Sequence, residues 1–145
     1  MRPEPFNHIG EATLIAKITD ENIVELVLGG EVTAESRSAI IAWAEKVREV
    51  LHYMKAQSPD RVLTLVDVSD LNGYDAEAIE ICRDLMANNR GLATKTAIYG
   101  ASTIVRVTIE LMIGITRRYS MKIFAEREEA HAWLLDDAQR PEISE

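Results

Sequence analysis

The most restrictive feature of this sequence is the stretch RVLTLVDV, residues 61–68, in which apolar side chains occupy both alternating faces. Successive side chains of a β-strand point to opposite faces, so a strand that is apolar on both faces has to be covered on both sides. Such strands are typical of parallel sheets that carry helices on each face. The stretch therefore predicts an α/β protein with residues 61–68 at the centre of its sheet.

The segments around this strand alternate between the periodicities of strands and helices. ATLIAKI and IVELVLGG, separated by the turn-like TDEN, predict an N-terminal β-hairpin. Further strands are predicted at 94–100 and 121–125, and helices at 33–57, 76–89, 102–119 and 126–137. We thus expect a mixed, mostly parallel five-stranded sheet with an N-terminal β-hairpin and about four helices.

Length and composition predict one domain over residues 1–145, which is enough chain for a single hydrophobic core. We expect its ordered part to span about 12–136, between a flexible leader and a disordered tail at 138–145. The net charge of −8 disfavours nucleic acid and anionic lipid surfaces as partners. A single cysteine and the absence of an apolar N-terminal run predict a cytoplasmic protein. Charged residues interrupt the longest apolar stretch, 103–115, so we expect no transmembrane segment.

Three segments carry a resemblance to a known family: LVDVSDLNGYDAEA at 65–78, AIYGASTIVRVTIELM at 97–112 and KIFAEREEAHAWL at 122–134. With the order of elements, they resemble the STAS domains, and among these the SpoIIAA-like branch of anti-sigma-factor antagonists. The resemblance implies a regulatory domain without enzymatic activity that binds a regulatory protein or forms a homodimer. SpoIIAA-like proteins are also similar in fold to lipid carriers of the Sec14 type. A carrier or sensor of a lipid-like ligand in an apolar cleft is therefore the alternative interpretation.

The start of the second predicted helix is where STAS domains of this type carry a phosphorylated serine. Their motif is an aspartate followed by two serines and a glycine, and alignment on the preceding DVS places it on residues 75–78. Ala76 then occupies the phosphorylated position, and it has no hydroxyl to modify. Asp75 and Glu77 favour a well-capped helix start here. Alternatively, Glu77 imitates part of the charge of a phosphoserine.

The start of the third predicted helix is a candidate anion-binding site. Ser102, Thr103 and Arg106 bring hydroxyls and a guanidinium near the free backbone N–H groups of a helix N-terminus. Ser102 is equally interpreted as a plain N-cap.

The same helix is apolar around most of its circumference, although packing on one face of a sheet needs an apolar arc of only about 100°. The surplus predicts a further contact. It packs against another helix of the domain, forms a homodimer interface, or lines an apolar pocket. Ile109, Met112 and Ile113 are the candidate residues.

No residues gather at catalytic or metal-binding spacing. His8, His52 and His131 are far apart, and Cys82 has no companion ligand and falls on the inner face of its helix. We expect no metal, no cofactor, an inert buried thiol at Cys82, and no enzymatic activity. An enzyme of unrecognised type is a second alternative, and it needs a pocket that gathers titratable side chains.

Overall fold

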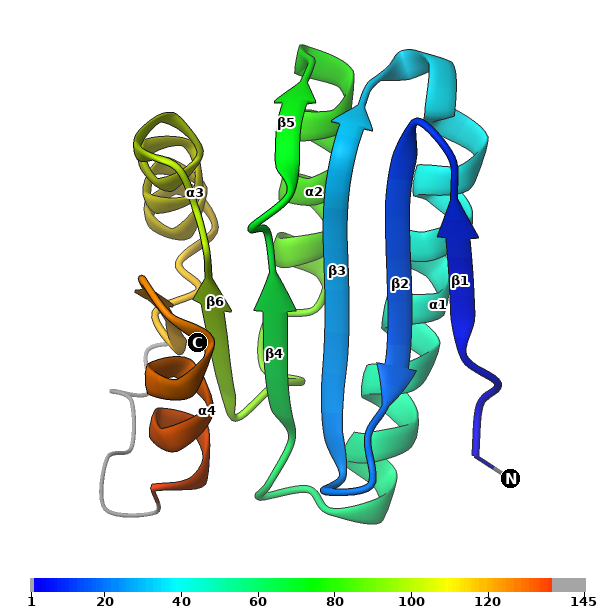
Figure 1. Cartoon of the computed structure of the whole chain (residues 1–145). Helices are drawn as coiled ribbons and strands as arrows, with labels where there is room; N and C mark the ends of the chain where they lie inside the picture. The colour runs from blue at the N-terminus through cyan, green and yellow to red at the C-terminus, as the bar shows by residue number, and fades with distance from the viewer. Residues whose placement is uncertain (1, 137–145) are drawn as a thin grey trace.

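The computed structural model describes residues 2–136, which form one sheet with helices on both faces. The strands are β1 (Phe6–Ile9), β2 (Ala12–Ile18), β3 (Ile23–Val32), β4 (Leu63–Asp67), β5 (Leu71–Tyr74), β6 (Lys95–Tyr99) and β7 (Met121–Phe124). The helices are α1 (Arg37–Gln57), preceded by the 3₁₀ turn η1 (Ala34–Ser36), then α2 (Ala76–Asn88), α3 (Thr103–Thr116) and α4 (Arg127–Leu135). Figure 1 shows α1 and α2 behind the sheet and α4 in front of it.

The sheet has the order β1-β2-β3-β4-β6-β7, with β5 beside the far end of β3. β1, β2 and β3 are joined by antiparallel pairing, and all other pairs are parallel. The ten-residue β3 pairs with β4 over residues 23–27 and with β5 over residues 30–32. The N-terminal hairpin and the mostly parallel sheet are thus confirmed.

The expected number of five strands is wrong, because the sheet has seven. β1 lies within the segment that we expected to be a loose leader, and it pairs with the open edge of β2 through partners such as Phe6 and Ala16. β5 has the sequence LNGY and lies between the strand predicted at 61–68 and the helix predicted at 76–89, where the sequence predicts no strand. Both strands have four residues, too few to show the alternation by which strands are recognised.

Side chains alternate across the central strands, as the stretch 61–68 predicts. Leu63 and Leu65 of β4 pack with α4, while Thr64 and Val66 face the layer of α1, α2 and α3. Both faces of β4 are therefore covered, and its place in the middle of a parallel sheet is confirmed.

The two N-caps considered in the sequence, Asp75 and Ser102, both form. Asp75 caps α2, because its Oδ1 accepts a hydrogen bond from the Ala78 N–H at 3.0 Å. Ser102 caps α3 through an Oγ that accepts from the Val105 N–H at 3.3 Å. Thr33 makes no side-chain cap bond, since the chain first forms η1 and α1 begins only at Arg37.

Within residues 2–136, no helix combines the length and the apolarity that crossing a membrane requires. The tail that we expected to be disordered, 138–145, lies outside the described residues.

Candidate functional site

An apolar cavity lies between the sheet and the layer of α1, α2 and α3. Its walls are aliphatic side chains of β3, β4 and β6, the inner faces of the three helices, two residues of β5 and one residue of β7. The space open to the centre of a water molecule is about 140 Å³. That is room for roughly ten water molecules, since each needs about 10–15 Å³ by this measure. Protein interiors normally contain few voids larger than one water molecule, so this cavity is a candidate binding site.

The cavity exists because α2 does not pack tightly on the sheet. Among the residues of α2 only Ala78 is buried. Ile79, Cys82, Leu85 and Met86 form the apolar face of the helix and line the cavity, yet each is only half-buried. The inner face of α2 is therefore incompletely covered: Leu85 packs against the core, while the face as a whole borders the cavity.

Helix α1 beside it is packed in the ordinary way. Six of its side chains are buried: Ile40, Trp43, Val47, Val50, Leu51 and Met54. In addition, the indole Nε1 of Trp43 donates a hydrogen bond to the carbonyl of Ile15 at 2.8 Å, which fixes the helix on β2. The cavity is thus a property of the part of this layer that α2 and α3 cover.

The thiol of Cys82 reports on the environment of the cavity. Burial raises its pKa to about 11, because the apolar surroundings disfavour the thiolate. The residue is nevertheless partly accessible, which fits a side chain whose open side faces the cavity. At neutral pH the group is a protonated thiol, so it acts as an apolar wall and not as a nucleophile.

Polar side chains gather at the end of the cavity where β4 and β6 begin. Thr64 and Thr96 are directly paired on these strands, and Asn89 follows the last residue of α2. Thr64 and Asn89 are 3 % and 1 % exposed, and both line the cavity. The Oγ1 of Thr64 and the Oδ1 of Asn89 make no hydrogen bond. A buried polar atom without a partner costs about 1–3 kcal/mol, so such atoms are rare in native proteins.

A buried guanidinium lies at the same end. Arg118, which is 3 % exposed, also lines the cavity. Its Nη1 donates to the carbonyl of Met86 at 3.0 Å, and its Nη2 to the hydroxyl of Thr96 at 3.5 Å. Arg118 therefore ties the C-terminal turn of α2 to β6 and brings positive charge to this end of the cavity.

A side-chain hydrogen bond spans the opposite end. The hydroxyls of Tyr74 and Thr108 are 2.7 Å apart and connect the end of β5 with α3. Both residues line the cavity and both are half-buried. The two ends of the cavity thus differ: Tyr74 and Thr108 satisfy each other, whereas Thr64 and Asn89 keep oxygens without partners.

The helix-start residues singled out in the sequence do not line the cavity. Asp75 accepts hydrogen bonds from the backbone N–H groups of Ala78 and Ala34, at 3.0 and 2.8 Å, and these bonds lower its pKa, that of Ala78 most. Glu77 forms an ion pair with Arg37 of α1, with 2.7 Å between Oε1 and Nε. Ala76 is exposed. Asp75 and Glu77 therefore stabilise the junction of η1, α1 and α2.

The candidate anion site at the start of α3 is likewise engaged in local contacts. Ser102 caps the helix, and Thr103 is exposed. The Nε of Arg106 pairs with Oε1 of Glu110 one turn later, at 3.3 Å. The observed contacts of Ser102 and Arg106 are thus those of a capped helix with an ion pair along its surface.

The apolar surplus of α3 is divided between its two faces. Ile109 and Met112 line the cavity, while Ile113 is partly buried against the core outside the cavity lining. On the outer face four large side chains are exposed by 53–75 %: Ile104, Val107, Leu111 and Ile115. We refer to these four as the outer α3 stripe.

Thr64, Asn89 and Arg118 were not predicted from the sequence as site residues. In the sequence, Thr64 is one polar residue in a buried strand, Asn89 looks like an ordinary helix end, and Arg118 follows Arg117 like a solvated charge. Only the fold brings the three together, because they come from separate segments. A polar residue in a strand that is otherwise apolar on both faces was the one available signal.

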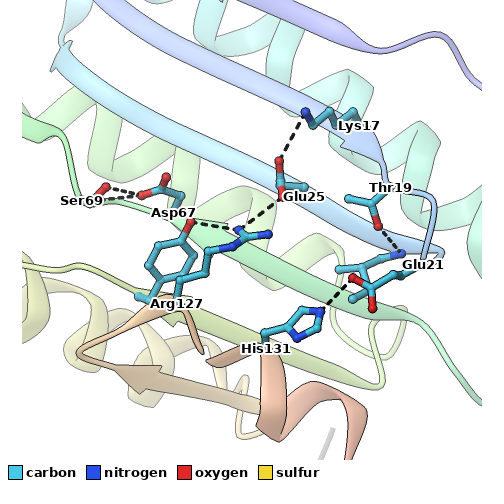
Figure 2. A network of polar contacts seen from close by, with 10 residues as sticks. Lys17, Thr19, Glu21, Glu25, Asp67, Ser69, Arg127 and His131 are labelled. Atoms are coloured by element: carbon cyan, nitrogen blue, oxygen red, sulfur yellow. Dashed lines mark hydrogen bonds and ion pairs between the residues drawn. The ribbon is translucent and has the colours of Figure 1, made fainter. Parts of the chain in front are cut away.

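The opposite face of the sheet carries a polar network that fixes α4 (Figure 2). Nη1 of Arg127 lies 3.5 Å from Oε2 of Glu25 and 3.3 Å from the hydroxyl of Tyr99. In the middle of the helix, His131 Nε2 is 2.9 Å from Oε1 of Glu21, in the turn between β2 and β3. Burial is the main cause that raises the pKa of Tyr99, so its hydroxyl stays protonated at neutral pH. These groups tie α4 to β3, to β6 and to the turn between β2 and β3.

Among residues 2–136, no three His, Cys, Asp or Glu side chains are placed to hold a metal ion together.

Comparison with known proteins agrees with this architecture. The sequence matches the SpoIIAA-like family over residues 13–135. Among solved structures, an uncharacterised protein of the DUF3478 family from Shewanella loihica PV-4, described as having a SpoIIAA-like fold, has a TM-score of 0.58 and 16% sequence identity. The match covers 89% of this chain and 98% of that chain. At this identity the likeness shows the fold alone. No curated protein matches the chain significantly.

Proposed function

This chain belongs to the SpoIIAA-like family, and we propose that it is a binding domain whose ligand is a small apolar molecule held in the cavity between the sheet and α1, α2 and α3. The family and fold support a binding or regulatory domain in general. The cavity is the observation that favours an apolar ligand over the protein–protein role that the sequence resemblance implies first.

The size and lining of the cavity support this proposal. Apolar cavities of similar volume, about 150 Å³, stay dry and bind molecules such as benzene. Transfer of a chain of about ten CH₂ groups from water into such a site gains roughly 8 kcal/mol, at about 0.8 kcal/mol each. Association costs at least about 4 kcal/mol, which leaves a net gain of about 4 kcal/mol or less, so the expected dissociation constant is about 1 mM or weaker.

The half-buried residues of α2 and α3 indicate how a ligand enters. Ile79, Leu85 and Met112 are half-buried and border the cavity, so they lose fewer contacts than fully packed side chains when the two helices separate. Breakage of the Tyr74–Thr108 hydrogen bond, which joins β5 to α3, opens the cavity from one end. Loop and helix motions of this kind fall in the microsecond to millisecond range.

A matched pair of variants on α2 tests the proposal. N-Phenyl-1-naphthylamine, a neutral probe that fluoresces in apolar sites, is titrated into the wild-type protein, Cys82→Phe and Ala87→Phe. Cys82 lines the cavity, and Ala87 is exposed on the other side of the same helix. Wild type and A87F bind the probe with saturation, and C82F loses binding by tenfold or more while keeping its circular dichroism spectrum. Equal binding by C82F and A87F contradicts the proposal.

The outer α3 stripe supports a second candidate function, contact with another protein and first of all with a second copy of this chain. Ile104, Leu111 and Ile115 are 75 %, 62 % and 67 % exposed on one helix face, which is unusual for side chains of this kind. Because Ala76 has no hydroxyl, such a contact is not switched by phosphorylation at that position. Light scattering on wild type and Leu111→Glu tests it: a wild-type dimer that the variant splits supports the contact, and two monomers exclude it. The free thiol of Cys82 fits a cytoplasmic setting for either function.

A further inference from the structure

We infer that the ligand is a single-chain amphiphile whose small oxygen-bearing head group, a hydroxyl or a carboxyl, is bound at the polar end of the cavity by Thr64 and Asn89. This inference rests on the proposed function, because it assigns the chemical class and the orientation of the ligand in the same cavity. A wholly apolar ligand fits the walls equally well but leaves this end unexplained.

Two buried oxygens of the cavity, Oγ1 of Thr64 and Oδ1 of Asn89, have no hydrogen-bond partner within the protein. Thr64 and Asn89 come from different elements, β4 and the end of α2, and they line the same end of one cavity. The cavity is otherwise walled mainly by aliphatic side chains, so the two polar groups have no role in packing it. Buried polar groups that bond neither to backbone nor to side chains complete their hydrogen bonds with water or with a ligand.

Asn89 is not needed to end the helix. Its own N–H donates to the carbonyl of Leu85 at 3.0 Å, and its carbonyl accepts from the N–H of Leu92 at 3.1 Å. The backbone groups at this position are therefore satisfied without the amide. Valine or leucine fills a buried position such as this one without an orphan oxygen, so the retained amide indicates a use for it.

The hydroxyl of Thr64 is likewise not needed for strand pairing in the sheet. Its backbone pairs with Val24 on one side and with Thr96 on the other, as in any central strand. The hydroxyl of Thr96 already accepts from Arg118 at 3.5 Å, whereas that of Thr64 makes no bond. A threonine hydroxyl can both donate and accept, and the Asn89 oxygen accepts. A head group with one O–H and a second lone pair satisfies both at once.

The distance between the ends of the cavity sets the chain length. Thr64 and Val68 line it at the two ends of one strand segment, four residues apart, which is about 13 Å at 3.3 Å per residue. An extended chain of about ten carbon atoms, with bonds of about 1.5 Å, covers this distance. The chain then runs along Val66 and Ile109 toward Tyr74 and Thr108, with its head inside and its tail at the end where the helices separate.

Arg118 separates the two head groups that share this chemistry. Its guanidinium lines the same end and adds positive charge there. Charge favours a carboxyl group, while Thr64 and Asn89 alone suit a hydroxyl. Both are therefore tested side by side.

The test displaces N-phenyl-1-naphthylamine with three molecules of equal chain length: 1-decanol, decanoic acid and 1-chlorodecane. The proteins are wild type, Thr64→Val, Asn89→Leu and, as a control, Thr116→Val. Thr116 is buried outside the cavity, where its hydroxyl donates to the carbonyl of Met112 at 2.6 Å. In wild type and T116V, decanol or decanoic acid competes about tenfold better than chlorodecane. The better competitor identifies the head group as a hydroxyl or a carboxyl.

The variants show whether Thr64 and Asn89 carry that preference. T64V and N89L weaken the preferred ligand by roughly five- to tenfold each and leave chlorodecane unchanged, as expected for the loss of one hydrogen bond. T64V replaces a hydroxyl by a methyl group of the same shape, so melting temperatures close to wild type verify that the variants fold. Equal competition by all three molecules, insensitive to T64V and N89L, overturns the inference and leaves an apolar ligand in place. If the probe binds but none of the three displaces it, the inference also fails. Absence of probe binding in wild type removes the proposed function itself.

Discussion

The two faces of the same sheet are covered in different ways. On one face α4 lies close against β4 and β6, where Ala130 and Leu134 are 0 % and 1 % exposed and fill the space between helix and strands. Opposite it, α2 presents Leu85 and Met86 to an open cavity. The strands are shared, so the difference lies in the helices and in the alternate side chains that the strands direct to each face.

Polar contacts reinforce this difference. Lys95 at the start of β6 reaches to the α4 side, where its Nζ donates to the carbonyls of Trp133 and Asp136 at 2.8 and 2.6 Å and lies 4.9 Å from the Trp133 ring. Arg127 holds the start of α4 to the sheet (Figure 2), and Lys95 holds its C-terminal end. On the cavity side, the Tyr74–Thr108 bond joins β5 to α3, and Arg118, just after α3, donates to the carbonyl of Met86 in α2. A rigid face and an adaptable face on one sheet are what a binding domain needs.

Replacement of one leucine by alanine on each face is expected to give the largest difference in stability between the two faces. Leu134→Ala leaves a new void in a filled region and is expected to lower the free energy of unfolding by about 2–5 kcal/mol. Leu85→Ala removes a half-buried side chain that borders the cavity, so its expected effect is about 1 kcal/mol or less. Urea denaturation of both variants measures the difference. Equal losses show that the cavity face is as tightly packed as the α4 face.

A larger side chain on each face is expected to destabilise the filled face and not the cavity face. Ala130→Leu forces a larger group into the contact between α4 and the sheet, and we expect a loss of about 1–3 kcal/mol. Cys82→Phe places its ring in the cavity and is expected to leave stability unchanged or to raise it. The melting temperature of A130L is therefore expected to fall, whereas that of C82F stays the same or rises. A large destabilisation by C82F argues that the cavity closes in solution.

Alkaline pH should weaken the cavity face through Cys82. Its pKa is raised from 9.0 to about 11 in the folded protein, so between these values the unfolded chain loses the proton more readily. The stabilising contribution is present below pH 9 and is lost as the pH rises through about 11, a loss of roughly 1–2 kcal/mol. Urea denaturation from pH 8 to 10.5 compares wild type with Cys82→Ala. Parallel curves for the two proteins count against a desolvated thiol.

The smallest expected effect is at Asp75, outside both packed regions. Its lowered pKa means that its contribution is present above the unfolded value of 3.8 and is lost as the pH falls through the still lower folded value. Asp75→Asn should therefore lower the melting temperature slightly at pH 7 and converge with wild type below pH 3.8. A difference that persists unchanged at pH 2.5 indicates that the charge of Asp75 is not what stabilises the helix start.

The sequence predicted the features that follow from periodicity and caps. The strand at 61–68 is buried on both faces, the hairpin forms, and Asp75 and Ser102 cap their helices. β1 and β5 were missed because short strands are defined by backbone pairing with an available edge, which leaves no side-chain pattern.

The candidate site was only partly predictable. The apolar surplus of α3 indicated a pocket wall or an interface, and Ile109 and Met112 do line the cavity. Whether apolar side chains meet one another or enclose a void depends on how closely two helices approach the sheet. That spacing is set by tertiary packing, so neither the cavity nor the meeting of Thr64 and Asn89 could be read from the sequence.

The methionines allow the most direct test of the account. Met86, Met112 and Met121 line the cavity, whereas Met54 is buried in α1 outside it. Protein labelled with ¹³C at the methionine methyl groups is titrated with benzene and followed by NMR. If the cavity binds benzene, the signals of the three cavity methyls shift together with one dissociation constant, the Met54 signal does not shift, and C82F abolishes the shifts. Cavity methyls that do not move, or that move no more than Met54, contradict the claim that this face encloses a binding site.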